Sequence, residues 1–170
     1  FTRGTSRDEY SAYTEDSRAY VANMERLELK WESAKRLLPM ARIKITHPQA
    51  RLGTIFYGST TPAAYEAIER LGTRGIGINT MRLRAFPFQH EVLDFIENHE
   101  LVFVIEQNRD GQMRTLLINE GGLPGGKLVS IACYDGLSVA SRFLVKSLER
   151  ALTERGINLE QLASRQGGAQ

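Results

Sequence analysis

The densest group of side chains that could do chemistry lies directly after an apolar run in the middle of the chain. Residues 101–105 are continuously apolar and rich in β-branched side chains, which is typical of a strand buried on both faces. Glu106, Asn108, Asp110 and Gln112 follow at once. Glu106 could serve as a general acid or base, but no histidine or nucleophile is close to it in sequence. We therefore favour a structural role, in which Asn108 or Asp110 caps the next helix and Glu106 accepts hydrogen bonds from backbone N–H groups of the turn.

A hydroxyl cluster at residues 59–61 also follows a predicted strand and opens a predicted helix. Free N–H groups and the helix dipole make such a position attractive to anions. Serine and threonine are, however, ordinary helix caps, and no glycine-rich nucleotide motif accompanies them. We favour capping here.

Two arginines and two phenylalanines form a further candidate group. Arg82 and Arg84 could bind a phosphate or a carboxylate at a strand end, although solvation or pairing with a neighbouring chain's carboxylate is the commoner use. Phe86 and Phe88 are expected in the core or in an interface.

Several kinds of site are disfavoured by composition. The single cysteine, Cys133, can form neither an internal disulfide nor a thiolate cluster, and we expect it to be a buried, inert thiol. His47, His90 and His99 lack metal-ligand spacing and are expected in loops or at helix ends. We predict no catalytic residue, no bound cofactor and no metal in this chain alone. The net charge of +2 does not favour nucleic acid, and no apolar run is long enough for a bilayer. Absent a secretory signal, we expect a cytoplasmic protein.

The elements that must position these residues alternate between strand and helix. The patterns predict strands at 53–58, 75–83, 101–105 and 129–134, with helices at 62–72, around 92–96, at 112–121 and at 139–155. Such alternation predicts an α/β fold: a three-layer α/β/α domain with a mainly parallel sheet. Ligands and partners of such folds gather at the carboxyl ends of the strands.

A helical arm precedes this domain. Residues 17–38 place Val21, Met24, Leu27 and Trp31 on one face of an amphipathic helix, which Pro39 ends. We predict an N-terminal arm with a connector at 1–50, the α/β domain at 51–157, and a C-terminal tail at 158–170 that is unstructured from Ser164 onward. The apolar face of the arm needs a partner surface.

Several segments, in this order, resemble the C-terminal part of the α subunit of two-subunit 2-oxoacid:ferredoxin oxidoreductases, over about residues 1–155. They are 4–10 and 13–16 in the arm, 24–27 and 30–32 in its helix, and 56–59, 83–88 and 104–113 in the domain. The last is the most specific.

The resemblance implies a fold similar to the transketolase C-terminal domain. It also implies a parent enzyme that oxidatively decarboxylates a 2-oxoacid, with 2-oxoglutarate as the first candidate, to an acyl-CoA. Thiamine diphosphate, Mg²⁺, an iron–sulfur cluster and coenzyme A would belong to the holoenzyme. The partners implied are the rest of the α subunit, a β subunit that carries thiamine diphosphate and the cluster, and ferredoxin.

The resemblance also implies that this part of the subunit assembles the complex and does not catalyse. We expect its contacts at the following residues: Trp31, Arg84, Phe86, Asn108, Gly111 and Gln112. A start at Phe1 without an initiator Met suggests a piece of a longer polypeptide. The alternative is an autonomous small-molecule or anion-binding α/β module that uses the turns at 59–61 and 108–111.

Overall fold

The computed structural model describes residues 6–167 of the chain and contains two compact units, Phe1–Leu38 and Pro39–Gln170. Residues 1–5, which include Gly4 and Thr5 of the resembling arm segment, and residues 168–170 lie outside the described part. Each unit is considered by itself.

The first unit consists mainly of helix α1, Ser17–Leu37. Its Asp16 cap accepts a hydrogen bond from the amide of Arg18 at 3.2 Å, and Leu38 is extended because Pro39 follows it. Before the helix, Arg7 and Tyr13 form an isolated antiparallel bridge. No residue of α1 is buried, so the whole apolar face predicted from the sequence is open in this chain.

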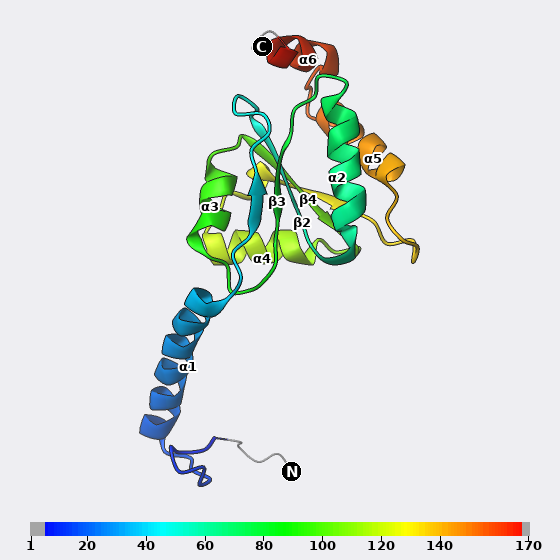
Figure 1. Cartoon of the computed structure of the whole chain (residues 1–170). Coiled ribbons are helices and arrows are strands. Elements are labelled where there is room, and N and C mark those ends of the chain that lie inside the picture. The colour runs from blue at the N-terminus through cyan, green and yellow to red at the C-terminus, as the bar shows by residue number, and fades with distance from the viewer. Residues whose placement is uncertain (1–5, 168–170) are drawn as a thin grey trace. The chain divides into compact units, whose positions relative to one another are not determined.

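The second unit is built on a five-stranded sheet in the order β1-β3-β2-β4-β5 (Figure 1). The strands are β1 Arg42–Lys44, β2 Leu52–Phe56, β3 Asn79–Arg82, β4 Leu101–Glu106 and β5 Leu128–Ala132. Strands β3, β2, β4 and β5 are parallel, and β1 runs antiparallel along the edge of β3.

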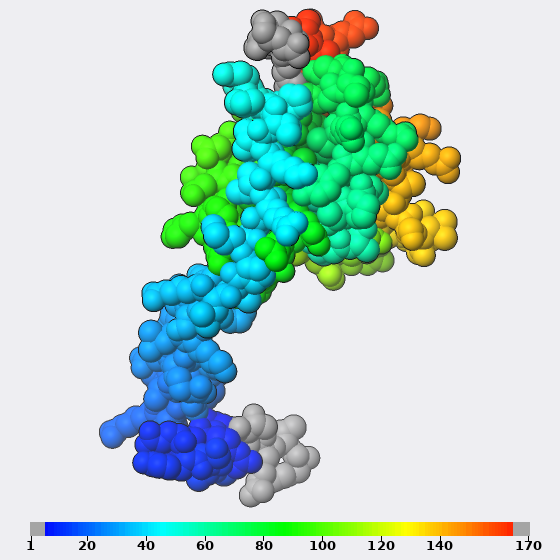
Figure 2. All heavy atoms as spheres, in the orientation of Figure 1, coloured from blue at the N-terminus to red at the C-terminus, as the bar shows by residue number. Residues whose placement is uncertain are grey.

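Helices cover both faces of the sheet. Alternate strand residues such as Phe56 and Phe103 pack against α2 (Thr61–Gly72) and α5 (Ser141–Glu154), which lie side by side in Figures 1 and 2. Their neighbours, such as Ile55 and Val104, pack against α3 (His90–Glu97) and α4 (Gln112–Gly121). The predicted three-layer α/β architecture with a mainly parallel sheet, preceded by a helix, is confirmed.

Two elements differ from the sequence-based expectation. The stretch predicted as a connector contains β1, whose three residues are too few to show a strand period. The tail predicted to be unstructured from Ser164 is wrong for residues 164–167, because helix α6 spans Leu159–Gly167. Asn158 caps that helix by accepting hydrogen bonds from the amides of Glu160 and Gln161.

Smaller differences concern the ends of elements. Strand β3 begins at Asn79, four residues later than predicted, although Ile76 and Ile78 are buried before it. The cap of α2 is Thr60, one residue earlier than the sequence suggested. None of the helices in residues 6–167 is long and apolar enough to cross a membrane.

Candidate functional site

The candidate site lies where the chain reverses its winding direction. From β2 the chain crosses to β3 on one side, and from β4 it crosses to β5 on the other, so the carboxyl ends of β2 and β4 form the topological switch point. This is the place where open α/β sheets bind ligands. The turn at 57–60 after β2 and the turn at 107–111 after β4 meet there.

Glu106 is the last residue of β4 and is completely buried. It shares a strand face with Val102 and Val104 and therefore points toward α4 rather than α2. One carboxylate oxygen accepts a hydrogen bond from the amide of Met113 at 2.8 Å, and the other accepts one from the amide of Arg114 at 3.3 Å. The predicted structural role of Glu106, as an acceptor for backbone donors, is confirmed.

The N-cap position differs from the prediction, but the predicted capping by Asn108 is present, because its Oδ1 accepts from the amide of Gln112, the first residue of α4. The N-cap of α4 is Gly111 in the left-handed region, at φ 63°, and it has no side chain to cap the helix. A Cβ atom at Gly111 would lie 3.3 Å from Ser130 Oγ and 3.7 Å from Glu106 Oε1. Glu106, at the end of β4, thus accepts the amide hydrogen bonds that the side chain of an ordinary N-cap residue would accept.

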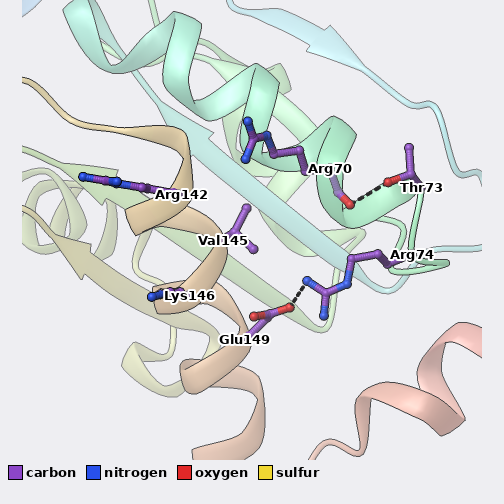
Figure 3. A pocket seen from close by; sticks show the side chains of 7 residues that line it. All are labelled: Arg70, Thr73, Arg74, Arg142, Val145, Lys146 and Glu149. Atoms are coloured by element: carbon purple, nitrogen blue, oxygen red, sulfur yellow. Dashed lines mark hydrogen bonds and ion pairs between the residues drawn. The ribbon is translucent and has the colours of Figure 1, made fainter.

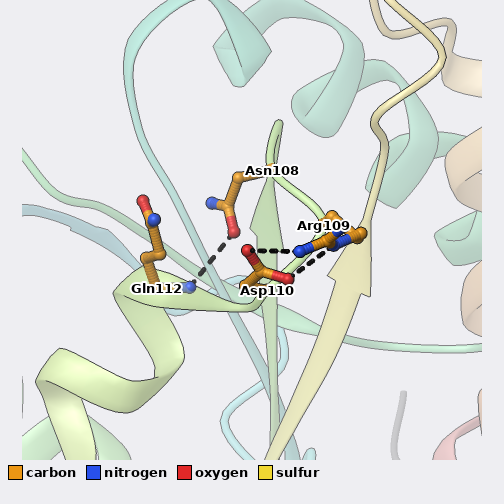
Figure 4. A network of polar contacts seen from close by, with 4 residues as sticks. All are labelled: Asn108, Arg109, Asp110 and Gln112. Carbon is orange, nitrogen blue, oxygen red and sulfur yellow. Dashed lines mark hydrogen bonds and ion pairs between the residues drawn. The ribbon is translucent and has the colours of Figure 1, made fainter.

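Asn108 joins the two sides of this turn. Its Nδ2 donates to Glu106 Oε2 at 2.6 Å, and its Oδ1 accepts from the amide of Gln112 at 3.2 Å (Figure 4). Arg109 and Asp110 instead pair with each other at the exposed tip of the turn. The side chain of Gln112 is exposed and has no dashed contact to the other three side chains in Figure 4. Of these residues, Gln112 is therefore available to a partner, whereas Asn108 is engaged within the turn.

Gln107 links the two turns of the switch point. Its Nε2 donates to Ser59 Oγ at 3.0 Å and to Thr60 Oγ1 at 3.2 Å. The Thr61 hydroxyl donates to the carbonyl of Gly58. The sequence did not single out Gln107, since only the pairing of β2 with β4 brings it to these hydroxyls.

Tyr57 lies near the buried carboxylate of Glu106, and the charge of this carboxylate affects the pKa of the tyrosine phenol. Burial raises the pKa of its phenol above the usual 10.0, and the negative charge of Glu106 raises this pKa further. A hydrogen bond with Asn108 acts in the opposite direction and lowers the pKa of Tyr57. The phenol is therefore held neutral at physiological pH.

The arrangement of these groups favours structure over catalysis. Both oxygens of Glu106 are used as acceptors, and the hydroxyls at 59–61 bond to protein groups. Within residues 6–167 there is no group of three or more His, Cys, Asp or Glu side chains that could hold a metal ion. The polar cluster predicted from the sequence thus joins β2, β4 and α4.

The strand-end arginines lie at the β1–β3 edge. Arg42 faces Arg82 directly across the two strands, and Arg82 Nε is buried without a hydrogen-bond partner among the described residues. Arg84 donates to the carbonyl of Met40 at 3.4 Å. Phe86 is half-buried and packs edge-on against Phe88, with ring centroids 5.0 Å apart.

His99 and Cys133 are both buried, and their contacts with other protein groups indicate structural roles. His99 is buried, with Nδ1 2.6 Å from the carbonyl of Phe95 and Nε2 3.1 Å from Asn79 Nδ2. These contacts fit a neutral ring that donates from Nδ1 and accepts at Nε2. Burial raises the pKa of the Cys133 thiol, and the charge of Asp135 raises it further, which agrees with the predicted inert thiol.

A second polar feature, which sequence reasoning missed, is a surface cavity of about 450 Å³ between α2 and α5 (Figure 3). Its lining residues are Arg70, Thr73, Arg74, Arg142, Val145, Lys146 and Glu149. Arg142 and Lys146 stand four residues apart in α5, and this spacing in the sequence could have indicated a basic surface.

No protein-family model matches the chain, and no curated protein matches its sequence. Among solved structures, a 2-oxoglutarate:ferredoxin oxidoreductase from Magnetococcus marinus is similar over 85% of this chain, with a TM-score of 0.74 and 20% identity. The matched 85% of the chain contains more residues than the second unit, Pro39–Gln170, so the match also includes part of the first unit. This chain spans only 25% of that protein, whose structure was determined with 2-oxoglutarate, coenzyme A and succinyl-CoA bound.

Two weaker matches have TM-scores too low to support an argument. A split-gene transketolase matches over 62% of this chain and 39% of its own, with 21% identity and a TM-score of 0.49. The α chain of a probable 2-oxoacid ferredoxin oxidoreductase from Thermoplasma acidophilum matches over 67% and 97%, with 24% identity and a TM-score of 0.43. At these identities, the comparisons show that the chain has the fold found in part of such oxidoreductases.

Proposed function

We propose that this chain is a structural and assembly domain of the α subunit of a thiamine diphosphate-dependent 2-oxoacid:ferredoxin oxidoreductase. The holoenzyme would oxidatively decarboxylate a 2-oxoacid, 2-oxoglutarate being the first candidate, to an acyl-CoA and reduce ferredoxin. The observation that carries the proposal is the structural likeness over 85% of this chain to one quarter of a 2-oxoglutarate:ferredoxin oxidoreductase chain.

This chain matches only a quarter of the larger oxidoreductase chain, so we assign substrate and cofactor binding to other parts of the holoenzyme. A segment equivalent to a quarter of a larger chain leaves the substrate and cofactor sites to the other three quarters and to a second subunit. Thiamine diphosphate, Mg²⁺, the iron–sulfur cluster and coenzyme A would be bound there, in a cytoplasmic complex. The switch point of this domain, where a ligand would be expected, is occupied by its own hydrogen bonds.

An assembly role also accounts for the open apolar side chains of α1. Val21, Met24, Leu27 and Trp31 stand on one face of the helix and are 43–53% exposed. Isolated exposed apolar residues are common, but a continuous stripe marks an interaction surface. We assign this stripe, in which Trp31 is the largest side chain, to contact with the rest of the α subunit or with the β subunit.

The second proposed contact surface is in the α/β unit. Arg84 and Gln112 are exposed and Phe86 is half-buried, so they are accessible to a partner. Asn108 and Gly111 would act indirectly, by holding the turn that presents Gln112. The arm at 1–50, the domain at 51–157 and the C-terminal segment from 158 remain our proposed division.

The parent reaction can be tested by dye reduction with the full-length complex purified anaerobically from its source. We expect coenzyme A-dependent reduction with 2-oxoglutarate, and not with pyruvate or 2-oxoisovalerate. Reduction with another acid would change the substrate assignment. No reduction with any of them, from a preparation that retains thiamine diphosphate and its cluster, would argue against the family.

The assembly role needs a separate test in the same complex. Trp31→Ala should reduce the amount of β subunit or remaining α-subunit polypeptide that copurifies, because it removes the largest side chain of the stripe. Leu29→Ala is the matched control, since Leu29 is 71% exposed on the same helix but lies outside the stripe. Equal assembly of the two variants would contradict the proposed contact.

The alternative is an anion-binding module that uses the two turns at the switch point. It is less well supported, because the polar side chains of these turns already bond to other protein groups. The hydroxyls of Ser59 and Thr60 accept from Gln107, and Asn108 bonds to Glu106 and Gln112.

A further inference from the structure

The cavity between α2 and α5 carries an imbalance of charge. Arg70, Arg74, Arg142 and Lys146 line it, against a single carboxylate from Glu149. Arg142 and Lys146 stand four residues apart on α5, whereas Arg70 lies in the last turn of α2 and Arg74 in the turn that follows this helix. Figure 3 shows Val145 between the two helices and the side chain of Arg142 extending outward from α5.

Only the α2 half of this cluster is neutralised. Arg70 pairs with Glu66 at 2.7 Å, and Arg74 pairs with Glu149. Both arginines also stand near the carboxyl end of α2, where positive charge is favourable. Local structure therefore explains Arg70 and Arg74.

The positive charges of Arg142 and Lys146 on α5 are not neutralised in this way. Arg142 and Lys146 are exposed and have no hydrogen-bond or ion-pair partner among the described residues. Like charges at positions i and i+4 of a helix repel each other. Arg142 also stands in the first turn of α5, where the helix dipole disfavours cations, and that turn has no acidic residue. This repulsion costs a small amount of stability, which an anion bound in the groove would offset.

We propose that the α2–α5 groove is a binding site for a small molecule that carries a diphosphate or phosphate group. Arg142 and Lys146 would contact the anion, and Arg70 would face it from the other helix. The cavity, at about 450 Å³, has the size of a small-molecule site, and Val145 adds an apolar surface for an organic part of the ligand. The site is independent of the assembly role proposed above.

Calorimetric titration of the full chain with sodium diphosphate at low salt tests the site. We expect saturable binding that weakens as sodium chloride is added. A parallel titration with ADP separates the possible sources, since tighter binding of ADP than of diphosphate indicates an organic ligand, and equal binding indicates the inorganic anion.

The double variant Arg142→Ala with Lys146→Ala should weaken diphosphate binding at least about tenfold, because it removes both unpaired cations. Arg26→Ala with Lys30→Ala is the matched control. It removes two exposed cations four residues apart on α1, neither of which lines the cavity, and should bind as the wild type does.

Thermal unfolding gives a second readout that does not depend on calorimetry. Without ligand, the Arg142→Ala, Lys146→Ala chain should be at least as stable as the wild type, because a repulsive pair is gone. Diphosphate should raise the melting temperature of the wild type and of the control, but not of this variant. Absence of saturable diphosphate binding, or binding that the variant leaves unchanged, would overturn the proposal.

Discussion

The carboxylate of Glu106 accepts from the amides of Met113 and Arg114 and from the side chain of Asn108, and water does not reach it. Glu106→Gln would replace one acceptor oxygen by an NH₂ group that faces these donors. We expect this change to lower the free energy of unfolding by about 3 kcal/mol, because buried donors are left without an acceptor.

The control for that prediction is Asp110→Asn, which removes the same charge from the exposed tip of the same turn. Among residues 6–167, Asp110 pairs only with its neighbour Arg109, so the expected change is within about 0.5 kcal/mol. Chemical denaturation of both variants at neutral pH is the measurement. Equal stability of the two would show that the hydrogen bonds of Glu106 do not hold α4.

Tyr57 gives a prediction about alkaline pH. Burial and the charge of Glu106 raise its pKa in the folded chain, so folding disfavours the phenolate. The stability that follows from this shift is fully present below the unfolded pKa of about 10 and is lost as the pH rises toward the folded value. The wild type should therefore lose more stability than Tyr57→Phe between neutral pH and pH values above about 10. Parallel loss in both chains, measured by urea unfolding, would contradict this.

At the residue scale, the sequence could reveal a polar side chain at the end of a buried strand but not all of its partners. Glu106 directly follows five apolar residues, so a role in satisfying the turn could be inferred. Gln107 bonds to Ser59 and Thr60, which are more than forty residues away, and this contact follows from strand pairing. The network of Asn79, His99 and the His47 backbone has the same origin.

The pairing of β1 with β3 leads to a prediction at the scale of elements. Arg42 and Arg82 are direct cross-strand neighbours, and like charges in such positions destabilise a sheet. Arg42→Glu should raise the free energy of unfolding by about 0.2–1 kcal/mol, since it replaces repulsion by attraction. In a chain that already carries Arg82→Gln, the same substitution should bring no gain. A double-mutant cycle by urea denaturation measures this difference, and equal effects in both backgrounds would exclude the repulsion.

Helices and strands with a clear hydrophobic period or a capping residue could be predicted from the sequence. Elements that form only because of contacts with distant parts of the chain could not. Strand β4 and helix α5 show their burial in their own sequences, and both were found within two residues of their observed ends. Strand β1 has three exposed residues and exists because β3 offers a free edge. Helix α6 places Leu159 and Leu162 against the core, and these two apolar residues were too few to indicate a helix.

At the scale of the whole chain, the two units differ in what stabilises them. The α/β unit has apolar cores on both faces of its sheet, and the central strands β2 and β4 are buried throughout. Helix α1 has 21 residues and buries none of them. A helix without tertiary burial relies on intrinsic propensity and lacks the packing from which helices in proteins gain most of their stability.

Amide hydrogen exchange should therefore separate the units. In the isolated chain, the amides of α1 should exchange much faster than those of β4, because opening a helix without buried side chains costs little free energy. If the apolar stripe of α1 contacts the remaining α subunit or the β subunit, the same amides should become protected in the assembled complex. Trp31→Ala should diminish this protection and Leu29→Ala should not. Slow exchange of α1 in the isolated chain would mean that the helix is already stabilised without a partner, and the assembly role of its stripe would then lose its physical basis.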